Sequence, residues 1–597
     1  MAAIHSTRKS RRSSIPDQWD LTDLVKDPVR QLDAHLSSIE AEVAQIESTR
    51  QTLNPALSDD EFASILNVSE TVAQGTSRLG AYAYLWFSEN TKNSKARSFK
   101  AHVEERLTAL QNRLLFFDLW WQSIDEKSAA RLLDGSGDFR YHLETIRRYK
   151  PHTLSEPEEK IINVKNVTGR SAVNTLYDVV TNGLTFTIKV GGKRKVLNRE
   201  GLMTYVRSPK AGVREAAYRE LYRVFSAQRD VLAEMYKTLV NDWKSENLGL
   251  RHFRSPIAAR NLGNDVPESA VDALLSVCAD NADLFQNYFE LKARICGIKS
   301  MSRYHLYAPH RADVKKYRYR DAVHMVLEAY RVFSPRLADL AEQVFSDRHV
   351  DAPTRTGKLG GAFCYSVVPG LTPYVLLNYT GDARDIATMA HELGHAVHAM
   401  LAAHHSVFTF HSTLPLAETA SVFGERILSD ALLQQESNKR IRQGLLLSQL
   451  DDIYATVLRQ AYFVRFERIA HQMIAGGATG DQLARTYLSE LRQQFGKAVR
   501  VPEEFQWEWL TIPHIYASPF YCYAYSFGNL LVLALYRTYQ QEGRRFVPKY
   551  LDLLATGGSL SPERILAAVN VDMTSKAFWQ SGFATIRDMI SQLEATL

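Results

Sequence analysis

Two histidines and a glutamate at residues 391–395, a His-Glu-Leu-Gly-His segment, have the types and spacing of a hydrolytic metal centre. Because residues four apart lie on one face of a helix, His391 and His395 can present both imidazoles to a single ion. Glu392 lies about 100° further round the helix, where its carboxylate can act on a water without binding the ion. Two histidine ligands, a third protein ligand and an open fourth position define a hydrolytic zinc site. The motif therefore predicts one Zn²⁺ per chain, with Glu392 as the general base.

This geometry requires a helix, and the surrounding residues predict one. Residues 382–403 carry apolar side chains at helical spacing, and Thr380 or Asp382 can cap the start. Just before this helix, residues 374–379 are rich in β-forming side chains and are bounded by a proline and a glycine, which predicts a strand. A strand that leads into a helix bearing two histidines is typical of a zinc-peptidase active site.

The third ligand must come from another part of the chain. In one class of zinc peptidases, the metzincins, a glycine and a third histidine follow the motif closely. The corresponding positions here hold His398 and Leu401, which excludes that arrangement. His398 lies one turn past His395 on the same face. Because three histidines and a glutamate would close the site, we interpret His398 as a residue behind a ligand or on the substrate side.

A glutamate from a second, downstream helix is the remaining source of a ligand, as in gluzincins. Glu418 and Glu425 are seven residues apart and would share one face of a helix that begins after Pro415. We assign Glu418 as the third ligand. Glu425 either forms a hydrogen bond to a ligand histidine from behind or is an ordinary solvated acid.

Other segments have distinctive compositions: Gly360-Gly361-Ala362-Phe363-Cys364-Tyr365, residues 376–379, 390–398, 417–425, 512–516 and 519–525, with 19–24 near the start and 550–558 and 578–579 near the end. Through these segments the chain resembles the oligoendopeptidase F branch of the thimet-oligopeptidase-like zinc peptidases over almost its whole length. The resemblance implies a mainly α, two-lobed fold with a deep central channel and a small β-sheet beside the HExxH helix. It also implies cleavage of internal bonds in short, unstructured oligopeptides.

The resemblance extends to the groups that bind the substrate. It implies a histidine and two tyrosines that bind the scissile carbonyl and its oxyanion. For these we assign His514 and Tyr525, with Tyr516 or Tyr521 as the second tyrosine and Tyr523 as a further substrate contact. The segment Gly360-Gly361-Ala362 lacks bulky side chains, so an extended peptide could pair with its backbone as an added strand; a turn without a binding role is the alternative.

Two other enzyme activities and one non-enzymatic role remain open. A helical zinc carboxypeptidase also uses His-Glu-x-Gly-His, but it carries a His-Glu-Ser second motif where this chain has Glu418-Thr-Ala-Ser. A dipeptidyl carboxypeptidase of the same broad family differs in channel loops that the sequence does not reveal. A peptide-binding protein without catalysis would have a broken motif, and every expected zinc residue is present here.

The length and periodicity of the chain predict its organisation. With 597 residues, 45% of them hydrophobic, the chain can bury a large core and form two or more lobes. Long stretches at residues 98–119, 210–248, 320–345 and 438–476 have helical periodicity. Residues 184–197 predict a hairpin with a Gly-Gly turn. We expect a basic disordered tail at 1–18, a helical lobe at 19–200 and the catalytic domain at 201–597.

Composition limits the partners. A formal charge of +6 is small for this length and argues against dedicated nucleic-acid binding. No stretch approaches the roughly 18 consecutive apolar residues of a membrane span. The basic run at residues 8–12 is not followed by an apolar region, so we expect no secretory signal. The four cysteines lack a disulfide spacing, which favours a cytoplasmic protein. Oligopeptides are the expected partners, and the oligomeric state is left open.

Overall fold

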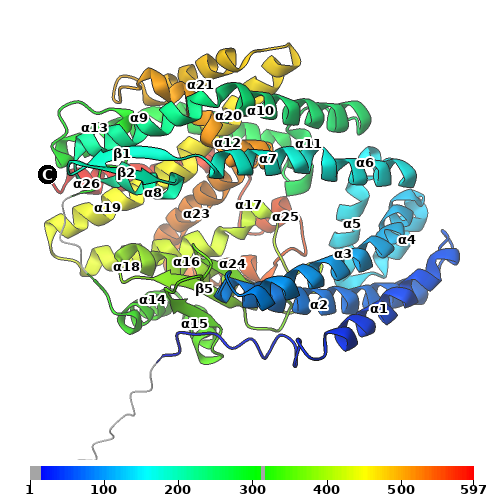
Figure 1. The fold of residues 1–597 in the computed structure, drawn as a ribbon. Coiled ribbons are helices and arrows are strands. Elements are labelled where there is room, and N and C mark those ends of the chain that lie inside the picture. Colours follow the sequence, from blue (N-terminus) through cyan, green and yellow to red (C-terminus); the bar gives the residue numbers. More distant parts are fainter. Residues whose placement is uncertain (1–14, 311–315) are drawn as a thin grey trace, which may run out of the picture.

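The protein is described by a computed structural model that covers residues 15–310 and 316–597. Figure 1 shows a mainly helical chain with two small sheets, as predicted. The basic run at 8–12 lies outside the described residues. Within the predicted tail, however, the backbone oxygen of Asp17 accepts a hydrogen bond from the amide of Ala352 at 2.8 Å, and Pro16 accepts one from the Tyr319 hydroxyl. The chain therefore joins the folded body before residue 19.

The first five helices share a core of their own. Phe62 packs on Phe117 and Trp121, with ring centroids 6.2 and 5.2 Å away. The buried residues of this core end at Leu143, whereas we predicted a lobe that extends to residue 200. These helices are α1 (Leu32–Ser48), α2 (Asp59–Glu89), α3 (Ser94–Ser123), α4 (Glu126–Asp134) and α5 (Arg140–Arg148).

The next helices and a hairpin pack into a second, larger core, to which Tyr177 and Phe186 already belong. The predicted hairpin is confirmed: β1 (Phe186–Val190) pairs antiparallel with β2 (Lys193–Leu197) through Gly191 and Gly192, which both have positive φ as this two-residue turn requires. The helices are α6 (Glu156–Thr168), α7 (Arg170–Asn182), α8 (Arg199–Met203), α9 (Ala211–Ala227), α10 (Arg229–Trp243), α11 (Ala258–Asn264), α12 (Glu268–Asp280) and α13 (Ala282–Cys296).

A three-stranded sheet lies beside the HExxH helix. Its order is β3 (Val350–Pro353), β5 (Tyr374–Tyr379) and β4 (Phe363–Tyr365), with β5 parallel to β3 and antiparallel to β4. The bounds of β5 are those predicted for the strand. The buried ammonium group of Lys358 pairs with Asp351 at 3.0 Å and donates to the backbone oxygen of Leu377 at 2.6 Å. It thereby ties the loop before β4 to the other two strands.

The two helices that carry the candidate ligands follow the sheet. The predicted helix at 382–403 is α16 (Ala383–Leu401), with Asp382 at its N-cap. The downstream helix differs from the prediction, because the chain turns at Glu418 between α17 (Leu414–Ala417) and α18 (Thr419–Gln435). Helices α14 (Tyr319–Phe333) and α15 (Pro335–Ser346) pack beside them.

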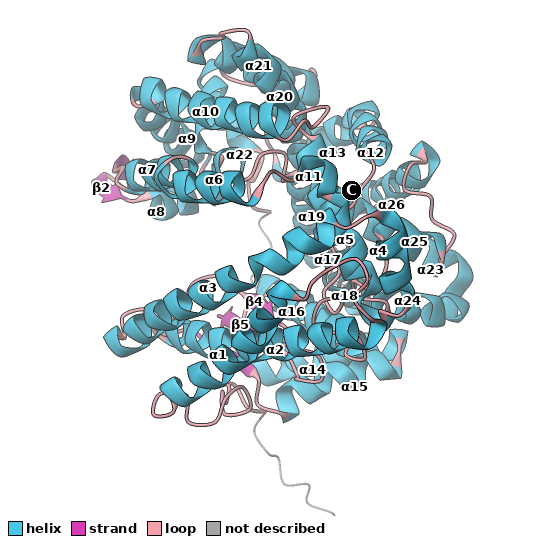
Figure 2. Ribbon diagram, turned by 90° about the vertical axis from the view of Figure 1, so that its right-hand side faces the viewer, coloured by secondary structure: helices cyan, strands magenta, loops and turns pink. Residues whose placement is uncertain are grey.

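The C-terminal helices connect two groups of helices. In Figure 2 one group contains α9, α10, α20 and α21, the other contains α1–α3 and α14–α16, and they meet on the side where α23 and α26 lie. The arrangement has two lobes, but one of them joins α1–α3, from the predicted N-terminal lobe, to α14–α16, from the predicted catalytic domain. None of the described helices combines the length and apolarity that crossing a bilayer requires. The C-terminal helices are α19 (Lys439–Ile453), α20 (Arg459–Ala475), α21 (Gly480–Phe495), α22 (Pro513–Ala517), α23 (Tyr523–Glu542), α24 (Phe546–Ala555), α25 (Pro562–Ala567) and α26 (Lys576–Glu594).

Helices α16 and α18 cross in direct backbone contact, and two glycines make this possible. A Cβ atom on Gly394 would lie 2.5 Å from the backbone oxygen of Ala420 and 2.6 Å from the Cα of Ser421. On the partner helix, a Cβ on Gly424 would lie 3.1 Å from the backbone oxygen of Ala390. Because backbone atoms cannot move aside as a flexible side chain can, any larger residue here must separate the helices.

We expect Gly394→Ala to destabilise the protein by about 1–3 kcal/mol, the usual cost of overpacking a close contact. Gly80→Ala is the matched control, because a Cβ there would meet only the Leu107 side chain at 3.6 Å. Alanine in the middle of α2 should be neutral or stabilising by about 0.4–1 kcal/mol. Scanning calorimetry of both variants measures the difference. Equal unfolding temperatures would contradict the close crossing.

Candidate metal centre

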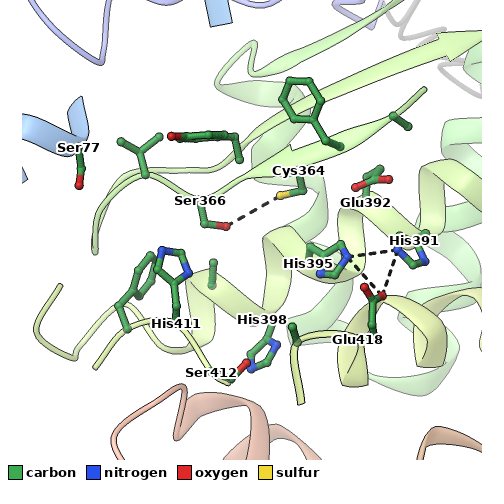
Figure 3. A pocket seen from close by; sticks show the side chains of 17 residues that line it. Ser77, Cys364, Ser366, His391, Glu392, His395, His398, His411, Ser412 and Glu418 are labelled. Atoms are coloured by element: carbon green, nitrogen blue, oxygen red, sulfur yellow. Dashed lines mark hydrogen bonds and ion pairs between the residues drawn. The ribbon is translucent and has the colours of Figure 1, made fainter. Parts of the chain in front are cut away.

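The histidines of the HExxH motif lie one turn apart on α16, with their rings nearly perpendicular at 80°. Their Nε2 atoms are 3.2 Å apart and face the same cavity (Figure 3). The start of the helix is fixed by a capping box between Asp382 and Asp385, and the Asp385 carboxylate also accepts the amide of Thr380 at 2.7 Å. The strand-to-helix turn therefore fixes where α16 begins, and with it the position of both histidines relative to the sheet.

Glu418 completes a triangle of donor atoms with the two histidines. Its Oε2 lies 3.3 Å from Nε2 of His391 and 3.6 Å from Nε2 of His395. In a tetrahedral zinc site with bonds of about 2.0–2.1 Å, ligand atoms are about 3.3–3.4 Å apart. Within the described residues, these three form the one group of histidine, cysteine and acidic side chains placed closely enough to share a metal ion. The group has the spacing of a four-coordinate centre.

Two neighbours hold the Glu418 side chain in place. The Ser421 hydroxyl donates a hydrogen bond to its Oε2 at 2.7 Å. Behind it, α23 passes so closely that a Cβ on Gly528 would lie 3.2 Å from the Cβ of Glu418. Neither residue was predicted. Ser421 belongs to the Glu418-Thr-Ala-Ser segment. Its spacing of three residues from Glu418 is the signal that could have identified it, because a helix or turn brings a hydroxyl at that position back to the carboxylate.

Glu425 supports His391 from the side away from the other ligands. Nδ1 of His391 donates to the Glu425 carboxylate at 2.5 Å, which leaves Nε2 to face Glu418 and His395. Burial alone would lower the pKa of His391, but the hydrogen bond and nearby carboxylates raise that pKa to about 9. Burial lowers the pKa of His395, which favours the neutral imidazole, the form that binds metals.

Glu392 is close to the donor group but outside it. In Figure 3 its carboxylate lies beside His391 and His395, the two candidate ligands, below Cys364 of β4. The side chain is buried, and burial raises its pKa to about 7, partly offset by the charge of His391. A carboxyl group with a pKa near neutrality can both accept and release a proton at physiological pH.

Two cavities of about 650 and 640 Å³ meet at the donor group, since His391 and Glu418 line both. The first cavity is bounded by β4, by Ser77 of α2 and by the other motif residues, and it includes His398 and His411. Burial lowers the pKa of His398 to about 3, so it is an uncharged wall residue. No role was predicted for His411.

The predicted peptide-binding segment precedes the edge strand β4. Ala362 lines the first cavity together with the three residues of β4. The Asn378 side chain donates to the backbone oxygens of Leu359 and Gly361 at 2.9 and 2.8 Å, and Gly361 has a φ of +80°. Gly360 and Gly361 thus form a fixed turn that leads into β4. The second edge of β4, opposite β5, has no strand partner within the described residues.

The aromatic segment places three of its predicted residues together. The His514 ring stacks 5.9 Å from Tyr521 and lies 6.0 Å from Tyr525, while the two tyrosines are 5.3 Å apart. Tyr525 lines the second cavity, as do His391 and Glu418, whereas His514 and Tyr521 line neither cavity and lie behind Tyr525. Burial, together with Tyr521, raises the pKa of the Tyr525 hydroxyl, which is therefore a proton donor for hydrogen bonds at neutral pH.

The other two tyrosines lie in the protein core. The Tyr516 ring stacks on Tyr177 with centroids 4.0 Å apart and is 1% exposed. The Tyr523 hydroxyl is fully buried and accepts a hydrogen bond from Asn264 at 2.8 Å. Neither lines the cavities at the donor group. Their placement gives no support to the expected substrate contacts. Tyr523 and Tyr525 are two residues apart in α23, about 200° round the helix, so they face opposite sides. Tyr516 belongs to α22 and faces the core.

Comparison with known proteins extends this picture over the whole chain. A family model described as peptidase family M3 matches residues 204–585, and one described as oligopeptidase F matches residues 120–186. Oligoendopeptidase F encoded on a plasmid of Lactococcus lactis subsp. cremoris is 26% identical over 98% of both chains. Oligopeptidase PepF of Bacillus subtilis is 26% identical over 90% of this chain and 82% of its own.

Solved structures have the same fold. A Chlamydophila abortus protein with 24% identity superimposes with a TM-score of 0.87 over 98% of this chain and 99% of its own. Oligoendopeptidase-F from Enterococcus faecium, with 23% identity, gives 0.71 over 95% and 99%. The family match begins just after α8 and ends within α26, so it includes the whole donor group. The chain belongs to peptidase family M3.

Proposed function

We propose that this protein is a zinc-dependent endopeptidase that hydrolyses internal peptide bonds of short, unstructured oligopeptides. The main support is the triangle of donor atoms at the junction of two cavities. A peptide that extends from one cavity into the other would present a bond away from its ends to the metal. Relatives named oligoendopeptidase F that match nearly the whole chain support the same activity.

His391, His395 and Glu418 would hold the ion, and Glu425 would fix the ring orientation of His391. Two imidazoles and a carboxylate favour zinc over harder cations such as Mg²⁺. When bound, zinc would supply Lewis-acid polarisation of the scissile carbonyl and make an attacking water acidic near neutral pH.

Glu392 would move the proton. Its carboxylate accepts a proton from the attacking water and delivers it to the nitrogen of the leaving amine. The raised pKa of the buried carboxyl suits both steps. Tyr525, assisted by His514 and Tyr521, would donate a hydrogen bond to the carbonyl oxygen as negative charge develops there. One such preorganised donor contributes about 2.7–4 kcal/mol to catalysis.

The substrate would bind as an extended strand along the free edge of β4, with its backbone paired to residues 362–365. Folded proteins do not offer such a strand, which is consistent with short, unstructured substrates. The four free cysteines are consistent with a cytoplasmic location.

Removal of a dipeptide from the C-terminus is the second candidate activity. It requires a cation that binds the terminal carboxylate, and Arg207 and Arg384 line the second cavity. Cleavage of an end-blocked peptide separates the two activities, because blocking removes that carboxylate.

We expect the unmodified protein to cleave an end-blocked peptide of about ten residues at internal bonds, and Glu392→Gln to retain zinc with nearly all turnover lost. The amide cannot accept the proton from water, whereas the ligands are unchanged. Mass spectrometry identifies the products and elemental analysis the metal. Cleavage only of the unblocked peptide would favour the carboxypeptidase, and an active Glu392→Gln would exclude this residue as the base.

We expect Glu418→Ala to lose the metal, because two histidines alone form an incomplete site. Glu328→Ala, which removes an exposed glutamate on α14, is the control and should keep one zinc per chain. Elemental analysis after dialysis measures both. Full zinc content in Glu418→Ala would show that another residue supplies the third ligand.

A further inference from the structure

The aromatic segment turns sharply at Phe520, between His514 and the two tyrosines that face it. Phe520 is fully buried and has a φ of +59°, in the left-handed region that a bulky residue rarely adopts. Such conformations cost about 1–3 kcal/mol and persist only where the surroundings impose them. Because Tyr521 follows directly, the turn decides where the Tyr521 ring lies against His514 and Tyr525.

Two side chains from distant parts of the sequence hold this turn by a single peptide group. Nε of Arg260, in α11, donates to the backbone oxygen of Pro519 at 3.1 Å. A carboxyl oxygen of Glu467, in α20, accepts the amide of Phe520 at 2.8 Å. The C=O of Pro519 and the N–H of Phe520 belong to the same peptide bond. The group is therefore fixed at both ends.

The hydrogen bond to the Phe520 amide is the one polar contact of Glu467 among the described residues. Glu467 is 0% exposed, and its second carboxyl oxygen has no hydrogen-bond partner among the described residues. Burial raises its pKa to about 8, so at neutral pH the group is mostly an uncharged acid. Burial of a carboxyl group with one hydrogen bond costs more than that bond returns. A contribution to stability therefore does not explain the residue.

We propose that Glu467, together with Arg260, is a positioning residue for catalysis: it holds the 519–520 peptide so that Tyr521 keeps Tyr525 where its hydroxyl meets the developing oxyanion. The inference rests on the proposed peptidase function. Neither residue touches the donor group or lines either cavity. The two residues act on the site indirectly, because the turn that they hold places Tyr521. The Tyr521 ring in turn contacts the rings of Tyr525, at 5.3 Å, and His514, at 5.9 Å.

The test compares Glu467→Leu with Glu467→Gln in the full chain. Leucine removes the acceptor, so we expect kcat to fall by about 10²-fold, the loss typical of one oxyanion donor, with KM and zinc content nearly unchanged. Glutamine has the shape of the uncharged acid and keeps an oxygen for the Phe520 amide. It should restore kcat to within about threefold of the unmodified protein, a rescue that lost packing would not show.

Binding measurements separate positioning from general damage. A phosphinic peptide, which mimics the tetrahedral intermediate, should bind Glu467→Leu more weakly by about the factor lost in kcat. The uncleaved substrate, measured in the inactive Glu392→Gln background, should bind equally well with and without Glu467→Leu. Equal weakening of both ligands would overturn the proposal, because it would indicate a disturbed cavity instead.

His471→Leu is the matched control on α20. Its ring packs 4.6 Å from that of Phe520, and its buried nitrogens have no hydrogen-bond partners among the described residues. The change alters packing at the turn but leaves the peptide group held, so kcat should be retained. A loss equal to that of Glu467→Leu would assign the effect to packing and overturn the proposal.

Arg260→Met covers the case in which Glu467→Leu does not fold, because it releases the other end of the same peptide and should lower kcat selectively. Unchanged kcat in the folded variants would overturn the positioning role while the peptidase function stands. Absence of cleavage by the unmodified, zinc-loaded protein would overturn both.

Discussion

The close crossing of α16 and α18 is the constraint on which the site depends. The two histidines project from one helix and Glu418 from the start of the other, so the distance between the helix axes sets the size of the donor triangle. Gly394 lies within the motif itself and permits the contact with Ala420 and Ser421. A glycine in a helix interior is usually destabilising by about 1 kcal/mol, which the direct packing of the two backbones offsets.

Around this crossing, neighbours outside the donor group orient two of its members. Ser421 holds the Glu418 carboxylate, and Glu425 holds the His391 ring. The Tyr330 hydroxyl donates to the backbone oxygen of Ala390 at 2.5 Å, next to the first ligand. Burial shifts the pKa values of two groups at the site. It lowers the pKa of His395, which favours the uncharged imidazole, and it raises the pKa of Glu392 toward neutrality. Position and protonation state thus come from different parts of the structure.

Short-range patterns in the sequence predicted the elements that carry the candidate ligands. The strand at 374–379, the helix at 382–403 and the Gly-Gly hairpin all follow from local periodicity and turn chemistry. Breaks inside long helical stretches were missed. The stretch 320–345 divides into α14 and α15 at Pro335, a residue that cannot continue a helix from its preceding turn. The stretch 210–248 divides at Gln228, where no residue type signals it.

Local sequence patterns did not predict which side chains contact distant segments of the chain. The tyrosine-rich segment could be assigned as a group, but its sequence does not show that Tyr525 faces the second cavity while Tyr523 points to Asn264. That choice depends on how α23 packs against α11. Likewise, Glu467 resembles any other acid in a helix until α20 is seen beside the 519–520 turn. Side-chain direction at a helix start is decided by tertiary packing, which local spacing does not encode.

One wall of the first cavity comes from a segment far from the motif in sequence. Ser77 of α2 lies across from the ligand helix, and Ala81 and Leu85 of the same helix pack against residues of the small sheet. The candidate metal ligands therefore lie in the stretch 391–425, whereas part of the first cavity is built by the N-terminal helices. Selection among peptides and the rate of bond cleavage are thereby separable properties. Substitutions in α2 can change the shape of the first cavity, and so which peptides fit it, without altering the donor group.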